Sequence, residues 1–243
     1  MKRKNRFNIC TLILVGLLFV FTNSCKKDDI AEDPNTVTDV DGNVYHTVTI
    51  GTQVWMAEEL KTTRYNDGTA IPLVTDKKSW SNLTTPGYCW YQNDQSTYGS
   101  TYGALYNWYA VNTGSLCPNG WHVPTKDEWK TLEGMVDSLY DVGDAEWDVV
   151  GFRGSDVGTI LKATTGWSNN GNGTNDFGFS ALPGGYRYNS GNFLDVGHFN
   201  FWWSSTESSS TRAWSLGLAF NNTKDFQYDP DKKVGFSVRC LQD

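Results

Sequence analysis

The chain has 243 residues, with 20 Lys and Arg against 27 Asp and Glu, and a formal net charge of −7 at pH 7. After the N-terminal segment, no Lys/Arg run remains that could neutralise phosphates, so the sequence excludes a nucleic-acid binder. The 11 Trp, 12 Tyr and 12 Phe exclude a disordered chain, and the 24 Gly, among many Asn and Ser, exclude a helical bundle. We therefore expect a folded, loop-rich domain.

Residues 1–24 have the three parts of a cleaved signal peptide. Basic residues between Lys2 and Arg6 precede an apolar run from Ile9 to Phe21, which ends at Thr22-Asn23-Ser24-Cys25. The run has 13 residues, whereas a helix needs about 20 to cross a bilayer, so cleavage is favoured over a retained anchor. Cleavage would remove four basic residues and no acidic ones, leaving a net charge of −11.

Cys25 directly follows the small residue Ser24 and resembles the cysteine of bacterial lipoproteins, which receives lipid on its sulfur and becomes the new N-terminus. Its acyl chains would anchor the protein to a membrane. The alternative is an ordinary secreted protein with a chance cysteine. The sequence Lys26-Lys27-Asp28-Asp29 resembles the acidic signal that sends lipoproteins to the cell surface in Bacteroidetes-type bacteria, or it is a solvated charged spacer. We expect a flexible tether over residues 25–37 and a surface-exposed outer-membrane protein, with the periplasmic face as the alternative.

The first patterns beyond the tether predict a hairpin and three helices. Alternating apolar residues predict a strand over 44–50, and residues 53–56 are expected to be its hairpin partner. The clearest helix begins after Thr125, because Thr125 and Glu128 have the spacing of a capping box, and its apolar face continues through Leu139. Weaker helices are expected over about 102–111 and over 156–162.

The last third of the chain has strand patterns. We expect strands over residues 177–182, 199–204, 214–220 and 234–240. Early helices followed by antiparallel strands indicate a single domain of the α+β class.

Ordered sequence blocks along this domain identify a family. The most informative are Cys117-Pro-Asn-Gly-Trp-His-Val-Pro-Thr, Phe179-Ser-Ala-Leu-Pro-Gly-Gly-Tyr-Arg, Trp202-Trp-Ser-Ser-Thr-Glu and Gly235-Phe-Ser-Val-Arg-Cys240. Residues 38–243 thereby resemble the Fibrobacter succinogenes major paralogous domain, for which no activity is established. That family resembles the C-type-lectin-like fold and the formylglycine-generating sulfatase-modifying factors. The resemblance implies that the N- and C-terminal strands lie close together and that long loops lie on one side.

The chain lacks the metal ligands of the enzymes that this family resembles. Aerobic formylglycine-generating enzymes hold copper with two cysteines a few residues apart, and Cys240 has no such neighbour. Sulfoxide-synthesising relatives hold iron with three histidines, whereas His46, His122 and His198 are widely spaced. We expect no catalytic residue and no cofactor. An uncharacterised enzyme or carbohydrate-active protein on this scaffold is the alternative.

Other polar residues have ordinary structural explanations. His122 is expected to pack and to bond to backbone, and the adjacent carboxylates Glu58 and Glu59 are expected in a cap or on a solvated face. The Gly-rich loop near residue 172 places oxygen ligands at Asn175 and Asp176. Calcium prefers about six to eight oxygens, but Asn-Gly sequences are equally good turn formers. A structural calcium therefore stays an alternative.

Three cysteines follow Cys25 in the chain, so they cannot all pair within one molecule. The resemblance to lectin-like folds, which staple the last strand to an earlier segment, implies a disulfide between Cys117 and Cys240. Burial of free thiols is the alternative, and Cys89 is left over.

Aromatic side chains provide the candidate ligand surface. A flat ring can stack on a sugar face, and we assign Tyr186, Arg187 and Trp203 to this surface. Adjacent residues of a strand point to opposite faces, so one of Trp202 and Trp203 is expected in the core and the other exposed. We expect a membrane-anchored, non-catalytic module that binds a glycan or a protein. A scaffold role is the further alternative.

Overall fold

The computed structural model describes residues 35–243. The expected signal peptide over 1–24, Cys25 and most of the expected tether lie outside the described residues. Strand β1 (Thr36–Thr38) pairs antiparallel with β2 (Val44–Ile50). The folded domain therefore begins within the segment 25–37 that we expected to be flexible, because β-branched Thr and Val side chains favour strand pairing. Within residues 35–243, no helix has the length and apolar character needed to span a bilayer.

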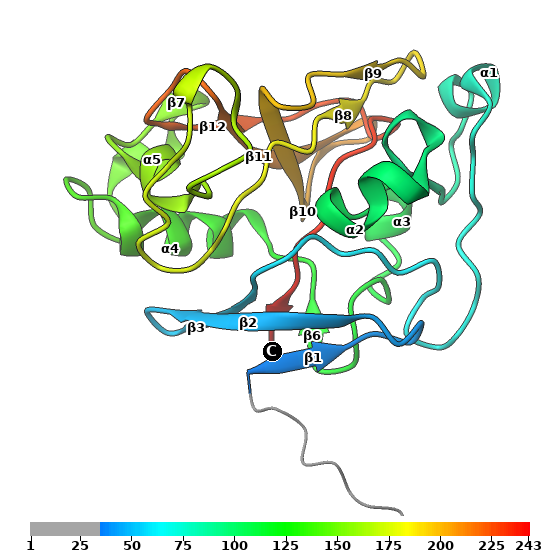
Figure 1. Cartoon of the computed structure of the whole chain (residues 1–243), viewed down its shortest axis with the longest axis horizontal. Coiled ribbons are helices and arrows are strands. Elements are labelled where there is room, and N and C mark those ends of the chain that lie inside the picture. Colours follow the sequence, from blue (N-terminus) through cyan, green and yellow to red (C-terminus); the bar gives the residue numbers. More distant parts are fainter. Residues whose placement is uncertain (1–34) are drawn as a thin grey trace, which may run out of the picture. The chain divides into compact units, whose positions relative to one another are not determined.

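The first sheet joins the two ends of the described chain (Figure 1). Its strand order is β1-β2-β3-β13-β6, where β3 is Gln53–Met56, β6 is Trp121–His122 and β13 is Leu241–Gln242. The hairpin expected over 44–56 is confirmed, and Gly51 makes its turn with a φ of 60° that suits glycine. Leu241 pairs with Trp55 on one side and His122 on the other, so the early and late strands are neighbours, as the resemblance implied.

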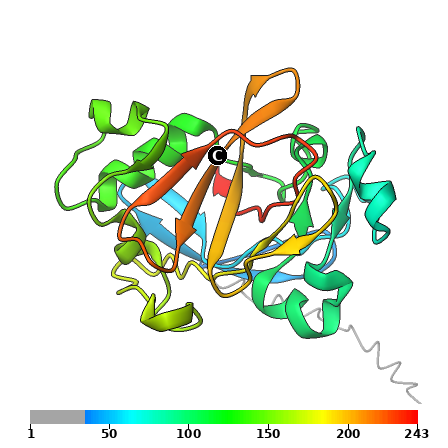
Figure 2. The same ribbon diagram turned by 90° about the horizontal axis from the view of Figure 1, so that it is seen from above.

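The second sheet has the order β10-β11-β12-β7 and is antiparallel throughout. Its strands are β10 (Phe199–Ser209), β11 (Arg212–Ala219), β12 (Asp225–Tyr228) and β7 (Gly151–Arg153). Strands β10 and β11 confirm the strand predictions over 199–204 and 214–220. Figure 2 shows strands β10, β11 and β12 of this sheet, gold to orange-red, lying over the blue strands of the first sheet. Two smaller ladders pair β4 (Tyr88–Cys89) with β5 (Leu105–Tyr106), and β8 (Tyr186–Arg187) with β9 (Phe193–Leu194).

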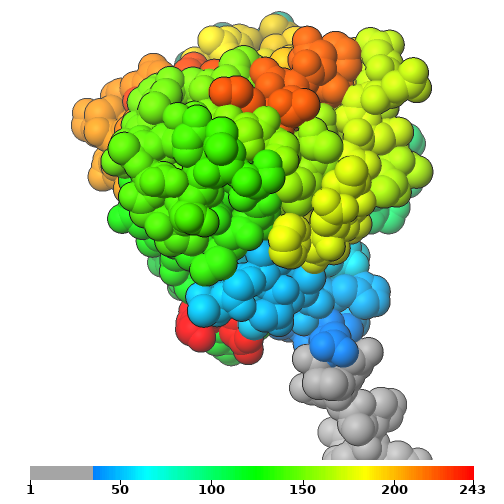
Figure 3. Space-filling view, turned by 90° about the vertical axis from the view of Figure 1, so that its left-hand side faces the viewer, coloured from blue at the N-terminus to red at the C-terminus, as the bar shows by residue number. Residues whose placement is uncertain are grey.

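The longest helix among residues 35–243 is α4 (Lys126–Val136), which begins at the predicted capping box. The Thr125 side chain accepts from the Glu128 backbone N–H, and the Glu128 carboxylate accepts from the Thr125 N–H at 2.7 Å. Helix α5 (Val157–Leu161) confirms the short helix. The remaining helical turns are α1 (Lys77–Ser81), η1 (Tyr91–Asn93), η2 (Gln95–Gly99), α2 (Ser100–Tyr102), α3 (Trp108–Val111), η3 (Ala145–Asp148) and η4 (Ser168–Asn170). Figure 3 shows α4 and the residues after it, green, and the yellow-green segment that follows α5 above the blue strands.

Four element predictions need correction. The helix expected over 102–111 is split, because Gly103 adopts a φ of 66° and β5 intervenes before α3. Helix α4 ends at Val136, before Leu139, which is 67% exposed. Segments 177–182 and 234–240 form isolated bridges and turns, because their backbone groups bond to several different neighbours instead of to one continuous strand.

Both faces of β10 are covered, and this places both neighbouring tryptophans in the core. Trp202 packs against Trp129 of α4 at 6.2 Å between ring centroids. Trp203 points to the other face, where it packs on Phe236 at 4.8 Å and donates to the Tyr106 carbonyl. Each side chain is 0% exposed. The expectation that one of the pair is exposed is therefore wrong, since that rule assumes a strand with one solvated face.

A buried ionic cluster ties α4 to the second sheet. The Arg153 guanidinium donates to both oxygens of Glu133 at 2.5 and 2.6 Å and lies 3.3 Å from Asp225 Oδ2. Burial raises the pKa of Asp225 well above its usual range, and the nearby Glu133 carboxylate adds to this rise. One guanidinium thus faces two carboxyl groups.

Candidate binding pocket

The three residues assigned to the ligand surface occupy different environments. Arg187 is 0% exposed, and its guanidinium donates to the Val74 and Thr75 carbonyls at 2.5 and 2.9 Å. Trp203 is equally buried, and only Tyr186 is partly exposed. The assignment is wrong for Arg187 and Trp203, because the guanidinium holds a neighbouring loop in place and the indole fills the core.

The cysteines pair as the resemblance implied. Cys117 and Cys240 form a disulfide with their Cα atoms 6.0 Å apart, and it joins the segments before β6 and β13. Cys89 is a buried free thiol. Burial raises the pKa of Cys89 to about 12, against an opposing effect of Arg187, so this thiol is protonated and poorly nucleophilic at neutral pH.

The Asn-Gly loop uses its amide oxygens for turns. Asn172 Oδ1 accepts from the Trp167 N–H at 3.0 Å, and Asn175 Oδ1 accepts from the Ser180 N–H at 2.6 Å. Asp176 is exposed. Within residues 35–243, no group of three His, Cys, Asp or Glu side chains is placed to hold a metal ion. The contacts of Asn172 and Asn175 are those of turn-forming residues.

We expected the His122 ring to bond to backbone, but it contacts two carboxylates instead. Its Nδ1 lies 2.7 Å from Asp243 Oδ1, and its Nε2 lies 3.0 Å from Glu128 Oε1. Burial would lower the pKa of His122, but the two carboxylates outweigh it and the pKa is raised. The imidazole thus links the C-terminal residue to the capping box of α4.

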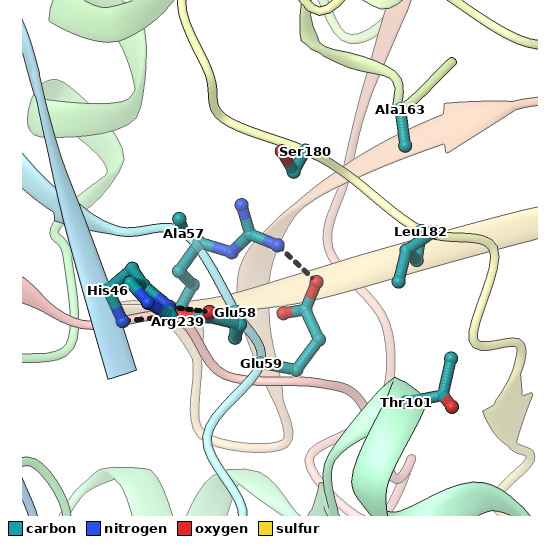
Figure 4. A pocket seen from close by; sticks show the side chains of 9 residues that line it. All are labelled: His46, Ala57, Glu58, Glu59, Thr101, Ala163, Ser180, Leu182 and Arg239. Carbon is teal, nitrogen blue, oxygen red and sulfur yellow. Dashed lines mark hydrogen bonds and ion pairs between the residues drawn. The ribbon is translucent and has the colours of Figure 1, made fainter. Parts of the chain in front are cut away.

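A pocket of about 340 Å³ gathers polar residues from distant parts of the chain (Figure 4). We call it the Glu59–Arg239 pocket. Its side chains come from β2, the loop after β3, α2, the segments around 163 and 180–182, and the segment before β13. They are His46, Ala57, Glu58, Glu59, Thr101, Ala163, Ser180, Leu182 and Arg239.

A buried ion pair lines this pocket. Arg239 Nη2 donates to Glu59 Oε1 at 2.6 Å, and the Trp202 indole N–H donates to Glu59 Oε2 at 2.6 Å. Glu59 is 4% exposed and Arg239 is 1% exposed, so the expectation of a capping or solvated Glu59 is wrong. Burial raises the pKa of Glu59, while Arg239 and Trp202 oppose the rise. The pair was missed because its members are 180 residues apart and neither belongs to a periodic pattern.

The ion pair retains unused hydrogen-bonding capacity. A guanidinium has five N–H donors, and Arg239 gives one to Glu59 and one to the Phe179 carbonyl. Its Nε is buried and has no partner within residues 35–243. A carboxylate offers about four lone-pair sites, of which the contacts above use two. The terminal N–H groups of Arg239 that these contacts leave unused lie beside the unused lone pairs of Glu59.

The rest of the pocket is polar at the mouth and apolar along the walls. His46 Nδ1 lies 2.6 Å from Glu58 Oε1, and these side chains are 73% and 43% exposed. Ser180 has a left-handed φ of 56° and accepts a hydrogen bond from the Asn175 amide at 2.9 Å. Ala57, Ala163 and Leu182 supply the apolar part. This arrangement can hold a small molecule that carries hydroxyl or amide groups on an apolar frame.

The fold and the pocket define a disulfide-linked α+β domain of two antiparallel sheets with a polar pocket beside their connecting segments. The family model of the Fibrobacter succinogenes major domain matches residues 48–242, and the chain belongs to this family. No curated protein and no solved structure matches the chain. The C-type-lectin-like topology therefore stays a prediction.

Proposed function

We propose that this protein is a lipid-anchored module of the cell surface that binds one neutral sugar unit of a glycan in the Glu59–Arg239 pocket. The observation that carries the proposal is a pocket of about 340 Å³ lined by the Glu59–Arg239 ion pair, whose described contacts use only part of its hydrogen-bonding capacity. Adjacent sugar hydroxyls can accept from the guanidinium and donate to the carboxylate.

The charges in the pocket favour a neutral ligand. Arg239 and Glu59 neutralise each other, and Glu58 is paired with His46 at the mouth. A strongly charged ligand group at the ion pair would have to separate two buried partners, which is unfavourable. A hydroxylated ring needs no such separation.

The size and walls of the pocket favour a single sugar ring. Its volume of about 340 Å³ lies near the lower end of the range of about 300–1,000 Å³ for small-molecule pockets. Ala57, Ala163 and Leu182 can contact the C–H groups of a ring whose hydroxyls face the ion pair. Only one unit of a longer glycan would enter.

The surface location in this proposal depends on the N-terminal sequence alone. Cys25 after the signal-like segment would carry the lipid, and the acidic residues after it would direct the protein outward. The Cys25→Ala variant should move from the membrane fraction to the soluble fraction. An unchanged membrane fraction would remove the anchor from the proposal.

Titration calorimetry with the methyl glycosides of glucose, galactose, mannose and N-acetylglucosamine tests the binding site. At least one should bind, and Thr101→Trp should weaken it about tenfold or more by filling the mouth, a loss of about 1.4 kcal/mol. Thr101 is exposed, so the fold should tolerate the change. Thr113→Trp, at an exposed position outside the pocket, is the matched control. The proposed site is rejected if no glycoside binds or if the two variants bind equally well.

A further inference from the structure

A second hollow, with a volume of about 270 Å³, is lined partly by residues that are close in sequence to those of the Glu59–Arg239 pocket. We call it the Lys61 pocket. Lys61 lies two residues after Glu59 in one loop, and Ser100 of this hollow directly precedes Thr101 of the other. Because each residue extends a chain by at most about 3.6 Å, the backbone positions of these neighbouring lining residues lie within about 7 Å of each other. Its lining consists of Asn43, Lys61, Trp90, Gln95, Gly99 and Ser100.

Lys61 is the charged group of this lining. Its ammonium lies 5.3 Å from the centroid of the Tyr45 ring and forms no salt bridge with any residue between 35 and 243. The nearby Asp39 carboxylate is already occupied. Its Oδ1 accepts from two backbone N–H groups, and its Oδ2 accepts from Asn43 Nδ2 and the Tyr45 hydroxyl. The lining therefore offers an ammonium that forms no salt bridge within the described residues.

The neighbouring groups suit an anion carried on a sugar. The Gln95 amide and the Ser100 hydroxyl are exposed and can donate to anionic oxygens. Asn43 gives its nitrogen to Asp39 at 2.8 Å, so its amide oxygen is left to accept from a sugar hydroxyl. Trp90 adds an apolar wall against which Gly99 packs, since a Cβ at residue 99 would lie 3.1 Å from Trp90 Cε3.

We propose that the Lys61 pocket binds the carboxylate or sulfate group of the sugar next to the one held by Arg239 and Glu59, so that the ligand is an acidic glycan. This inference rests on the proposed function and names the substrate class of that site. The net charge of the chain is negative, but charges beyond about 8 Å are screened at physiological salt. The Lys61 ammonium can then pair directly with an anionic group in the hollow.

The test compares three disaccharides that share one neutral unit and differ in the neighbour, which is neutral, a uronic acid or a sulfated sugar. Titration calorimetry of the wild type should show the uronic acid or the sulfated form binding about tenfold tighter than the neutral form. The two acidic forms distinguish carboxylate from sulfate. Lys61→Met keeps the aliphatic stem and should abolish this preference while leaving the affinity for the neutral disaccharide unchanged.

Lys78→Met is the matched control, because Lys78 is exposed on α1 and outside both pockets. It should keep the preference. The inference is overturned if the wild type shows no preference for the acidic disaccharides, or if the preference survives Lys61→Met. In either case, binding of the neutral disaccharide still supports the Glu59–Arg239 pocket. If Lys61→Met abolishes the preference but Thr101→Trp does not weaken binding, the Lys61 pocket is supported and the Glu59–Arg239 pocket is rejected. Absence of any binding overturns both.

Discussion

Replacement of Glu59 by Gln should strongly destabilise the domain, because it leaves the buried Arg239 charge without its partner. The carboxylate accepts two hydrogen bonds of 2.6 Å, from Arg239 and Trp202. Bonds to a charged group contribute about 1.5–3 kcal/mol each, and loss of one partner of a buried pair costs about 3–5 kcal/mol. A Gln amide can still accept from Trp202, but its NH2 group would face the donors of Arg239. We expect a loss of about 3–5 kcal/mol in the free energy of unfolding.

Urea unfolding followed by Trp fluorescence measures this loss, with linear extrapolation to water. Glu58→Gln is the matched control, because Glu58 is the adjacent residue but belongs to an exposed pair with His46, and such pairs contribute at most about 1 kcal/mol. The double variant Glu59→Leu/Arg239→Met removes both charges and should recover part of the loss. If Glu59→Gln costs no more than Glu58→Gln, the ion pair is not buried and paired as described.

The remaining predictions concern the disulfide and two titrating groups. The Cys117→Ser/Cys240→Ser variant should lose about 4–5 kcal/mol of unfolding free energy in urea, because the bond closes a loop of 123 residues; equal stability with or without reductant in the wild type would contradict this. The pKa of His122 is raised in the folded protein, so the charged imidazole stabilises the fold. This stabilisation is fully present below the pKa of about 6.5 in the unfolded chain and is lost as the pH rises through the pKa in the folded protein. The stability advantage of the wild type over His122→Gln should thus shrink above about pH 6.5, and a constant difference from pH 5 to 9 would refute the linkage. Because burial raises the pKa of Asp225, the neutral isostere in Asp225→Asn should change thermal stability less than Asp225→Ala, and the reverse order would contradict this reasoning.

Local sequence was sufficient for several elements. The α4 capping box joins Thr125 and Glu128 within one helical turn, and the hairpin of β2 and β3 has adjacent strands and a glycine turn. In such elements the interacting groups are close in sequence, so period and turn chemistry identify them. The same reasoning failed over 177–182 and 234–240, where a strand-like pattern of apolar residues fills the core without a continuous ladder.

The candidate site depended on contacts that no local pattern records. Burial of Trp203 and Arg187 follows from the layers that cover β10 and β8, whereas the sequence shows only that these residues are aromatic and basic. From the sequence, Glu59 is one of two adjacent acids expected in a cap or on the surface. In the structure, the segment before β13 places Arg239 against it.

By itself, the sequence determined the family, the α+β class and the capping box of α4, because each depends on residue order over short distances or on ordered blocks. The tertiary structure alone decided which charged side chains are buried and which donors are left unpaired. These properties depend on how segments that are distant in sequence pack together and exclude solvent. Burial then raises the free energy of a charge or of an unpaired donor.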